Sequence, residues 1–309
     1  MFQRILRVIS IINERNYITS RLKFVFLLSN LSTMHVYRKI DVAVIESFIT
    51  KFAAKYIKQR EQTQFDYSTL DAGFLYEKTG FNTDKIQEII KQNAVPVDFK
   101  REVGLTPAIL NDIYRSDLGE LLMTYYFEEK LPEGQRYIIP LKNITFRELA
   151  NLPGRGLDAI GYRLDGDKIE ILLGEAKVSG EMKSPPAVVD TTNDSIFNTQ
   201  KKHRENKSVV IGKLSDYARR LNGHDATMIG IAMVTMEYDM TDRYSVTYGC
   251  TLIRDHICVN DVSDFGKLKK NSADFEPHKI HFSILSFKGK TIPETVDLFY
   301  RKVQKLITG

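Results

Sequence analysis

The sequence contains only two cysteines, Cys250 and Cys258, among its 309 residues. A disulfide framework needs more cysteines than this, and a cysteine-based zinc site needs them in closer pairs. We therefore expect two half-buried free thiols in a reducing environment, which favours a cytoplasmic location.

Long hydrophobic runs are also missing. A membrane-spanning helix needs roughly 20 consecutive apolar residues, and no run in the sequence approaches that length. Arginines break the apolar N-terminal stretch, and no small-residue cleavage site follows it, so a secretory signal is not expected. We expect no membrane partner.

A strong excess of one charge is absent as well. The formal net charge is +5, and residues 1–33 contribute most of it, with five basic residues against one acidic residue. The rest of the chain is close to neutral, so any nucleic-acid surface must be a local basic patch. Residues 1–33 form a basic N-terminal extension with three open interpretations. It is a basic amphipathic helix that docks on a partner, an ordinary first helix, or an upstream extension of a chain whose natural start is Met34.

The sequence has no glycine-rich loop that would cradle phosphates and no convincing nucleophilic triad. We therefore expect no small-molecule substrate. The apolar content of 43% and the charged content of 27% are typical of a globular protein.

Helical spacing of apolar residues dominates the first third of the chain. It predicts a helix over residues 41–60 and a short capped helix over residues 82–90. We interpret residues 34–104 as a mainly helical N-terminal portion. A long helix over residues 107–131, with proline at its first position, then opens a second domain of residues 105–309.

The centre of the chain has a hairpin pattern. Alternating apolar residues at 157–164 and 168–178 flank the turn Asp165-Gly166-Asp167, and an Asp-Gly pair between two such runs is typical of a β-hairpin. Further helices are expected over residues 208–221 and 291–306. Further strands are expected over residues 227–235, 244–252, 253–259 and 279–287. The second domain is therefore a sheet flanked by helices, an α/β (α+β) fold.

One strand of this hairpin ends in charged residues on an otherwise apolar face. Side chains alternate along a strand, so Ile169, Ile171, Leu173, Glu175 and Lys177 share one side. Burying a carboxylate and an ammonium is costly unless they are paired or hold a metal. This pattern indicates a site rather than ordinary packing.

Asp158 begins the preceding strand, and an antiparallel hairpin brings it beside Glu175 and Lys177. Two converging carboxylates suit a hard divalent cation such as Mg²⁺ or Mn²⁺, and the main-chain carbonyl of Ala176 is a third candidate ligand. Such a site can hydrolyse a phosphodiester. Lys177 then either orients or deprotonates the attacking water, and near a metal and apolar walls we expect its pKa to be depressed.

These residues resemble the PD-(D/E)xK nuclease superfamily, with Leu157-Asp158 as the first half-motif and Glu175-Ala176-Lys177 as the second. The resemblance implies a restriction-endonuclease-like core sheet flanked by helices. Many members also carry a glutamate on the helix before the hairpin, which implies a catalytic role for Glu120. A polar or basic residue on the following helix is common too, and Gln200, Lys201 and Lys202 are candidates.

The Arg-Gly-Leu-Asp-Ala-Ile-Gly-Tyr and Leu-Gly-Glu-Ala-Lys-Val segments are similar to the HamA family, the nuclease subunits of Hachiman anti-phage defence. HamA-like proteins accompany a helicase, HamB. The resemblance implies a deoxyribonuclease that a HamB-like helicase subunit restrains until activation.

The basic run containing Lys201, Lys202 and Arg204 has two open interpretations, a phosphate-contacting surface or a solvated face. A second class of function is also open. The chain can be a catalytically inactive nuclease-fold module that binds nucleic acid or clamps a helicase. Retention of Asp158, Glu175 and Lys177 favours the active enzyme.

Overall fold

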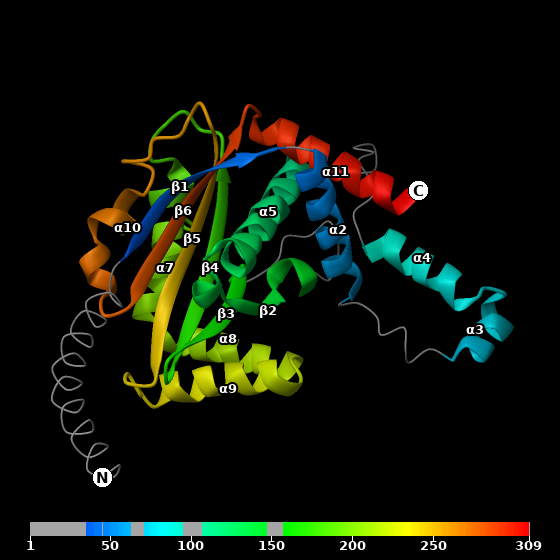
Figure 1. Ribbon diagram of the computed structural model, residues 1–309, viewed down its shortest axis with the longest axis horizontal. Coiled ribbons are helices and arrows are strands. Elements are labelled where there is room, and N and C mark those ends of the chain that lie inside the picture. The colour runs from blue at the N-terminus through cyan, green and yellow to red at the C-terminus, as the bar shows by residue number, and fades with distance from the viewer. Residues whose placement is uncertain (1–34, 45, 63–70, 95–106, 147–156, 309) are drawn as a thin grey trace, which may run out of the picture.

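The structure is a computed structural model that describes residues 35–44, 46–62, 71–94, 107–146 and 157–308 (Figure 1). Its centre is a six-stranded sheet with the order β1-β6-β5-β4-β3-β2. The strands are β1 (Val36–Ala43), β2 (Ile138–Lys142), β3 (Ala159–Asp165), β4 (Lys168–Ser179), β5 (Tyr244–Asp255) and β6 (Lys279–Lys288).

The sheet is mixed. β1, β6, β5 and β4 run parallel to one another. β3 pairs antiparallel with both β4 and β2. The predicted hairpin is confirmed: Asp165 pairs with Lys168, so Gly166 and Asp167 form a two-residue turn. Gly166 has a φ of 62°, a conformation that glycine adopts without steric cost.

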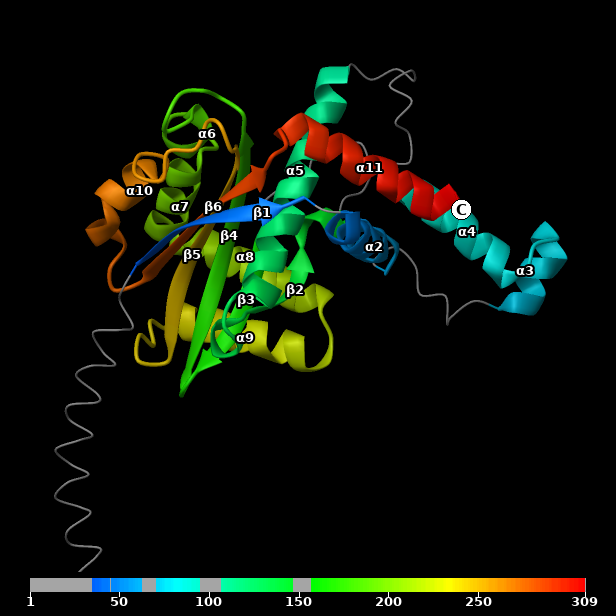
Figure 2. The same ribbon diagram turned by 45° about the horizontal axis from the view of Figure 1, so that its top comes forward.

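Helices cover both faces of the sheet (Figure 2). One face packs against the helices that follow the hairpin in sequence: α6 (Ala187–Asp190), α7 (Ile196–Glu205), α8 (Lys207–Arg220), α9 (Gly223–Glu237) and α10 (Gly266–Lys270). The other face packs against α2 (Glu46–Gln62), α5 (Pro107–Tyr125) and α11 (Ile292–Thr308). A π-helical turn, Tyr126–Lys130, extends α5, and short 3-10 turns lie at Glu133–Gln135, Asn143–Phe146 and Ser272–Phe275.

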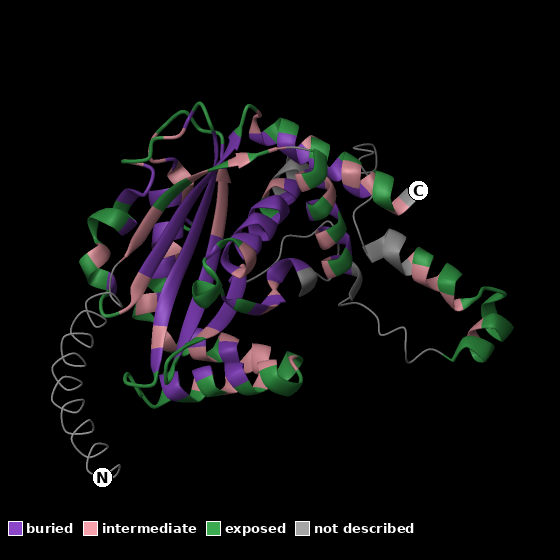
Figure 3. Ribbon diagram, in the orientation of Figure 1, coloured by how far each residue is buried: buried purple, intermediate pink, exposed green. Residues whose placement is uncertain are grey.

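Alternation along β4 divides the two cores. Ile169, Ile171 and Leu173 pack against the α7–α9 side, whereas Leu172 packs against the end of α5. Figure 3 shows the central strands buried along most of their length. A sheet with both faces covered by helices confirms the mixed α/β fold class expected from the sequence.

The helices α3 (Ala72–Thr79) and α4 (Thr83–Ala94) project away from the sheet in both views (Figures 1 and 2). Asp71 caps α3 by accepting a hydrogen bond from the Phe74 N–H, and Gly80 ends it with a φ of 73°. The predicted short helix at residues 82–90 corresponds to α4.

Three predicted elements differ from the structure. Residues 227–235 form part of the helix α9 and not a strand. The helix expected from residue 41 begins at Glu46, because residues up to Ala43 belong to β1. The strand expected at residues 253–259 does not exist separately, since β5 continues to Asp255 and a turn follows.

Because β1 belongs to the central sheet, the portion from residue 34 to 104 is not helical throughout. The extension 1–33 and the proposed boundary at residue 104 lie outside the described residues. Among the described helices, none has the length and apolar character needed to cross a membrane.

Candidate active site

The β3–β4 hairpin brings Asp158 and Glu175 together. Ala159 pairs with Gly174, and continuing this register by one residue places Asp158 opposite Glu175. Opposed residues of an antiparallel pair have Cβ atoms about 5 Å apart. The two carboxylates therefore meet where β3 begins and β4 continues beyond it.

The main chain of β4 fixes Asp158. Its Oδ2 accepts a hydrogen bond from the Ala176 N–H at 2.7 Å. The N–H and C=O of one strand residue leave the strand on the same side, so the Ala176 carbonyl also faces the side of Asp158. The local backbone thus offers a carbonyl oxygen close to the two carboxylates.

Lys177 joins this group through two ion pairs. Its Nζ lies 3.1 Å from Glu175 Oε1 and 3.1 Å from Asp194 Oδ2. Asp194 comes from the loop between α6 and α7, and its side chain is 77% exposed. Asp194 was not predicted from the sequence, because no pattern links an exposed loop aspartate to a strand lysine.

Glu175 is 4% exposed. Burial raises the pKa of its carboxyl well above the ordinary value, and the negative charge of Asp158 adds to this effect. The positive charge of Lys177 opposes the rise but does not cancel it. The chain alone therefore does not fully stabilise the ionised form of Glu175.

Lys177 does not have the depressed pKa that we expected. Burial on its own lowers it, but the negative charges of Glu175 and Asp158 outweigh burial and raise the pKa of the ammonium above its ordinary value. In the chain alone Lys177 is a cation. Charge compensation of the two carboxylates would weaken the interaction that raises its pKa.

Two residues of α8 face the same charges. Burial lowers the pKa of Lys213, while the carboxylates of Glu175 and Asp158 oppose that change. Burial raises the pKa of Tyr217 to about 12, and the charges of Asp158 and Glu120 contribute to the rise. Lys213 and Tyr217 lie one helical turn apart, so they project from one side of α8. Neither residue was predicted from the sequence to belong to the site, because their spacing does not indicate which element this side of α8 faces.

Glu120 approaches the site from the opposite side of the sheet. It is a buried residue of α5, and α5 packs on the face of β4 that carries Ala176 and Val178. Its charge contributes to the raised pKa of Tyr217 of α8. Within the described ranges, however, no three His, Cys, Asp or Glu side chains are grouped so that they could hold a metal ion.

A family model for HamA matches residues 28–303. The chain belongs to the HamA family. This membership associates it with Hachiman defence. No curated protein and no solved structure matches the chain.

The predicted basic run of this HamA-family chain lies on α7, and its members differ. Arg204 donates to the Asp274 carbonyl, pairs with Glu205 at 3.0 Å and stacks over the Phe275 ring. Lys201 lies 3.8 Å from Glu205, and Lys202 is exposed and close enough to Lys213 to lower its pKa. Lys202 is therefore the member of the run that acts on Lys213 of α8.

Gln200, the other candidate on α7, is fully buried. Its Nε2 donates to the Leu173 carbonyl at 3.0 Å, and the Gly249 carbonyl lies 3.5 Å away. Gln200 thus bonds α7 to β4 and β5 at Leu173, two residues before Glu175. This contact positions α7 against the strand that carries Glu175.

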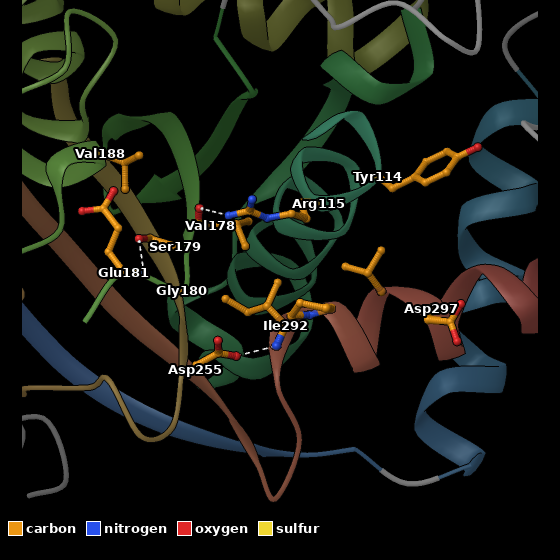
Figure 4. Close-up of a pocket in the computed structure, with 12 residues that line it drawn as sticks. Tyr114, Arg115, Val178, Ser179, Gly180, Glu181, Val188, Asp255, Ile292 and Asp297 are labelled. Carbon is orange, nitrogen blue, oxygen red and sulfur yellow. Dashed lines mark hydrogen bonds between the residues drawn. The ribbon is translucent and has the colours of Figure 1, made fainter. Parts of the chain in front are cut away.

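A cavity of about 630 Å³ lies beyond the end of β4. Figure 4 shows Arg115 of α5 donating to the Val178 carbonyl, at 3.0 Å, and Asp255 accepting from the Ile292 N–H. The lining of this cavity does not include Asp158, Glu175 or Lys177. The candidate site of this HamA-family chain is therefore the charged edge of β4 and not this enclosed space.

The residues at that edge fit a divalent metal ion. Two carboxylates and a main-chain carbonyl form an all-oxygen donor set, which suits Mg²⁺ or Mn²⁺. Mg²⁺ in proteins keeps several waters and uses one or two carboxylates, so a third carboxylate is not required. Burial and the neighbouring Asp158 disfavour the ionised form of Glu175 and raise its pKa, and a cation bound beside it would favour that ionised form.

Proposed function

We propose that this chain is a metal-dependent nuclease that cleaves DNA as the effector subunit of a Hachiman defence complex. One observation carries the proposal: Asp158 stands opposite Glu175, with Lys177 paired to Glu175, at an edge of β4 that β3 leaves open. Carboxylates with a lysine on one strand edge are the parts that phosphodiester hydrolysis requires.

In this proposal Asp158, Glu175 and the Ala176 carbonyl hold Mg²⁺ or Mn²⁺. When bound, the ion neutralises charge on the phosphate and assists activation of water. The Ala176 N–H keeps the Asp158 carboxylate oriented at 2.7 Å. In this proposal Glu120 of α5 orients a water at the site.

Lys177 acts as a cation. Its ammonium, held by Glu175 and Asp194, stabilises negative charge that develops on the phosphate in the transition state. The ion pair with exposed Asp194 is replaceable, because a phosphate oxygen can take the place of that carboxylate. In this proposal Lys213 and Tyr217 of α8 contact the phosphate backbone.

The partner belongs to the proposal through family membership. HamA-like proteins accompany a HamB-like helicase, so we infer that the helicase restrains the nuclease and delivers DNA to it.

The test is cleavage of plasmid and linear DNA by the purified protein, with Mg²⁺, Mn²⁺ or EDTA, alone and with the helicase. Lys177→Ala is compared with Lys168→Ala, which removes an exposed lysine at the far end of β4. We expect metal-dependent cutting by the parent and by Lys168→Ala, and none by Lys177→Ala. Equal cutting by all three proteins contradicts the proposal. Cutting of RNA but not DNA would mean that the substrate is RNA.

A further inference from the structure

The C-terminal helix α11 has two chemically different sides. Val296, Phe299, Tyr300 and Val303 are buried against the core. Arg301, Lys302 and Lys305 lie on another side, at three, four and seven residues after Leu298. This spacing puts the cations on one stripe of the helix.

This stripe lines a cavity of about 340 Å³ between α2 and α11. The two helices are adjacent in both views (Figures 1 and 2). The lining residues are Val44, Glu46, Ile49, Lys290, Leu298, Arg301, Lys302 and Lys305. Four cations and one acid line this cavity, so its lining has a net positive charge.

Internal ion pairs neutralise only part of that charge. Lys302 Nζ lies 2.5 Å from Glu46, and Arg301 Nε lies 2.8 Å from Asp297. Neither Lys290 nor Lys305 forms an ion pair with any residue that the structure describes. A weaker attraction still links Lys305 to Glu46 and Lys290 to Glu294. The Glu46 carboxylate lies at the N-terminal end of α2, where the helix dipole already favours negative charge.

The basic run of α7 has less uncompensated positive charge than this cavity. Glu205 lies against both Lys201 and Arg204, and the Asp274 carbonyl holds Arg204. The α2–α11 cavity therefore has more uncompensated positive charge than the run that the sequence marked as basic.

We propose that the α2–α11 cavity binds the phosphate backbone of DNA, as a contact separate from the cleavage residues. The inference rests on the proposed function in taking DNA as the ligand. A stripe of Lys and Arg along one helix is the electrostatic footprint of backbone recognition, and it reads no bases. In the sheet order β6 lies two strands from β4, about 10 Å away, and α11 follows β6. Because helices cover both faces of the sheet, the route from the cleavage site to α11 runs past the carboxyl ends of these strands, where the Ile292 N–H at the start of α11 donates to Asp255 of β5.

The experiment measures binding of a labelled DNA duplex by fluorescence anisotropy over a range of salt concentrations. Lys177→Ala protein in EDTA is the parent, so that cleavage does not interfere. The test variant adds Lys290→Gln and Lys305→Gln. The matched control adds Lys168→Gln and Lys270→Gln, which remove the same charge from exposed positions on β4 and α10.

We expect the slope of log K against log salt to become shallower by about 2 in the test variant, since each lost phosphate contact removes roughly 0.9 from its magnitude. The control should keep the slope of the parent. Equal slopes in both variants, or a parent that does not bind the duplex, would overturn the inference. Cleavage by the protein that keeps Lys177 separates the two proposals. If that protein cuts DNA but the test variant keeps the slope of the parent, only the DNA-binding role of the cavity is wrong. If the slope becomes shallower but no cutting occurs, only the proposed nuclease activity is wrong.

Discussion

Asp158 accepts a hydrogen bond from the Ala176 N–H at 2.7 Å, so the carboxylate that precedes β3 is bonded to the strand that carries Glu175 and Lys177. This bond gives Asp158 two separable roles. Its oxygen accepts from the Ala176 N–H, which has no partner in β3. Its charge contributes to the proposed metal site. Substitutions that remove one role at a time can distinguish them.

Asp158→Asn keeps an oxygen acceptor but removes the charge, whereas Asp158→Ala removes both. We expect both variants to lose cleavage by at least about 100-fold. Only Asp158→Ala should also lose stability, by about 1 kcal/mol, because the Ala176 N–H loses its partner. Plasmid cleavage and urea unfolding measure the two effects. Equal stability of the two variants would show that the hydrogen bond contributes little.

A divalent cation should stabilise the folded chain through the same carboxylates. At a concentration about 100 times Kd, a ligand that binds only the folded state adds about 2.7 kcal/mol. We expect Mn²⁺ to raise the melting temperature of the parent but not that of Glu175→Gln. Asp167→Asn, in the hairpin turn, is the control and should respond like the parent. A shift in Glu175→Gln as large as in the parent argues against this site.

The other end of β4 allows a pH-dependent prediction. Glu170 is buried at 2% exposure. Burial on its own raises its pKa, but neighbouring groups reverse this and lower the pKa from 4.5 to about 2; they are Lys279, Thr247, Tyr137 and Arg163. A carboxyl with a lowered folded-state pKa stabilises the protein above its unfolded pKa, and that stability disappears as the pH falls through the folded value.

Glu170→Gln should therefore destabilise the protein at neutral pH, by about 3 kcal/mol. The difference from the parent should shrink as the pH falls from 4.5 towards about 2. Urea unfolding at successive pH values measures it. Glu133→Gln, an exposed glutamate, is the control and should show no such trend. A difference that stays constant with pH would mean that the charge of Glu170 contributes no net stability.

The part of the site predictable from sequence is the part held by local geometry. The Asp-Gly turn and the alternating apolar residues specify the register of β3 against β4, and that register places Asp158 opposite Glu175. Asp194, Lys213 and Tyr217 come from later elements whose packing no local pattern specifies. Their contribution to the site depends on how α7 and α8 dock on the sheet.

The missed elements have physical reasons. The apolar run at residues 227–235 has no periodicity that separates a buried strand from a helix, and the helix α9 leaves Ile231 and Val234 exposed at 44% and 42%. β1 was missed because its partner, β6, is about 240 residues later in the chain: Val36 pairs with His281. Parallel pairing over such a distance leaves no local signature.

The contact of α5 with β4 depends on Gly119, next to Glu120. A Cβ at this position would lie 2.8 Å from Val178 Cγ2 and 3.5 Å from Ile253 Cδ1. Val178 follows Lys177 directly and is a short branched side chain with little freedom to move. Gly119→Ala must therefore push α5 away from β4, and we expect a loss of about 1–3 kcal/mol in the free energy of unfolding.

The same displacement moves Glu120, so cleavage should fall by about tenfold or more if Glu120 belongs to the site. Gly230→Ala is the control, because a Cβ there meets no atom within 4 Å and alanine favours the helix α9 by up to about 1 kcal/mol. Urea unfolding and plasmid cleavage of both variants measure the effects. A stable Gly119→Ala protein with full cleavage would show that α5 does not need this close contact. Lost stability with full cleavage would separate Glu120 from the chemistry.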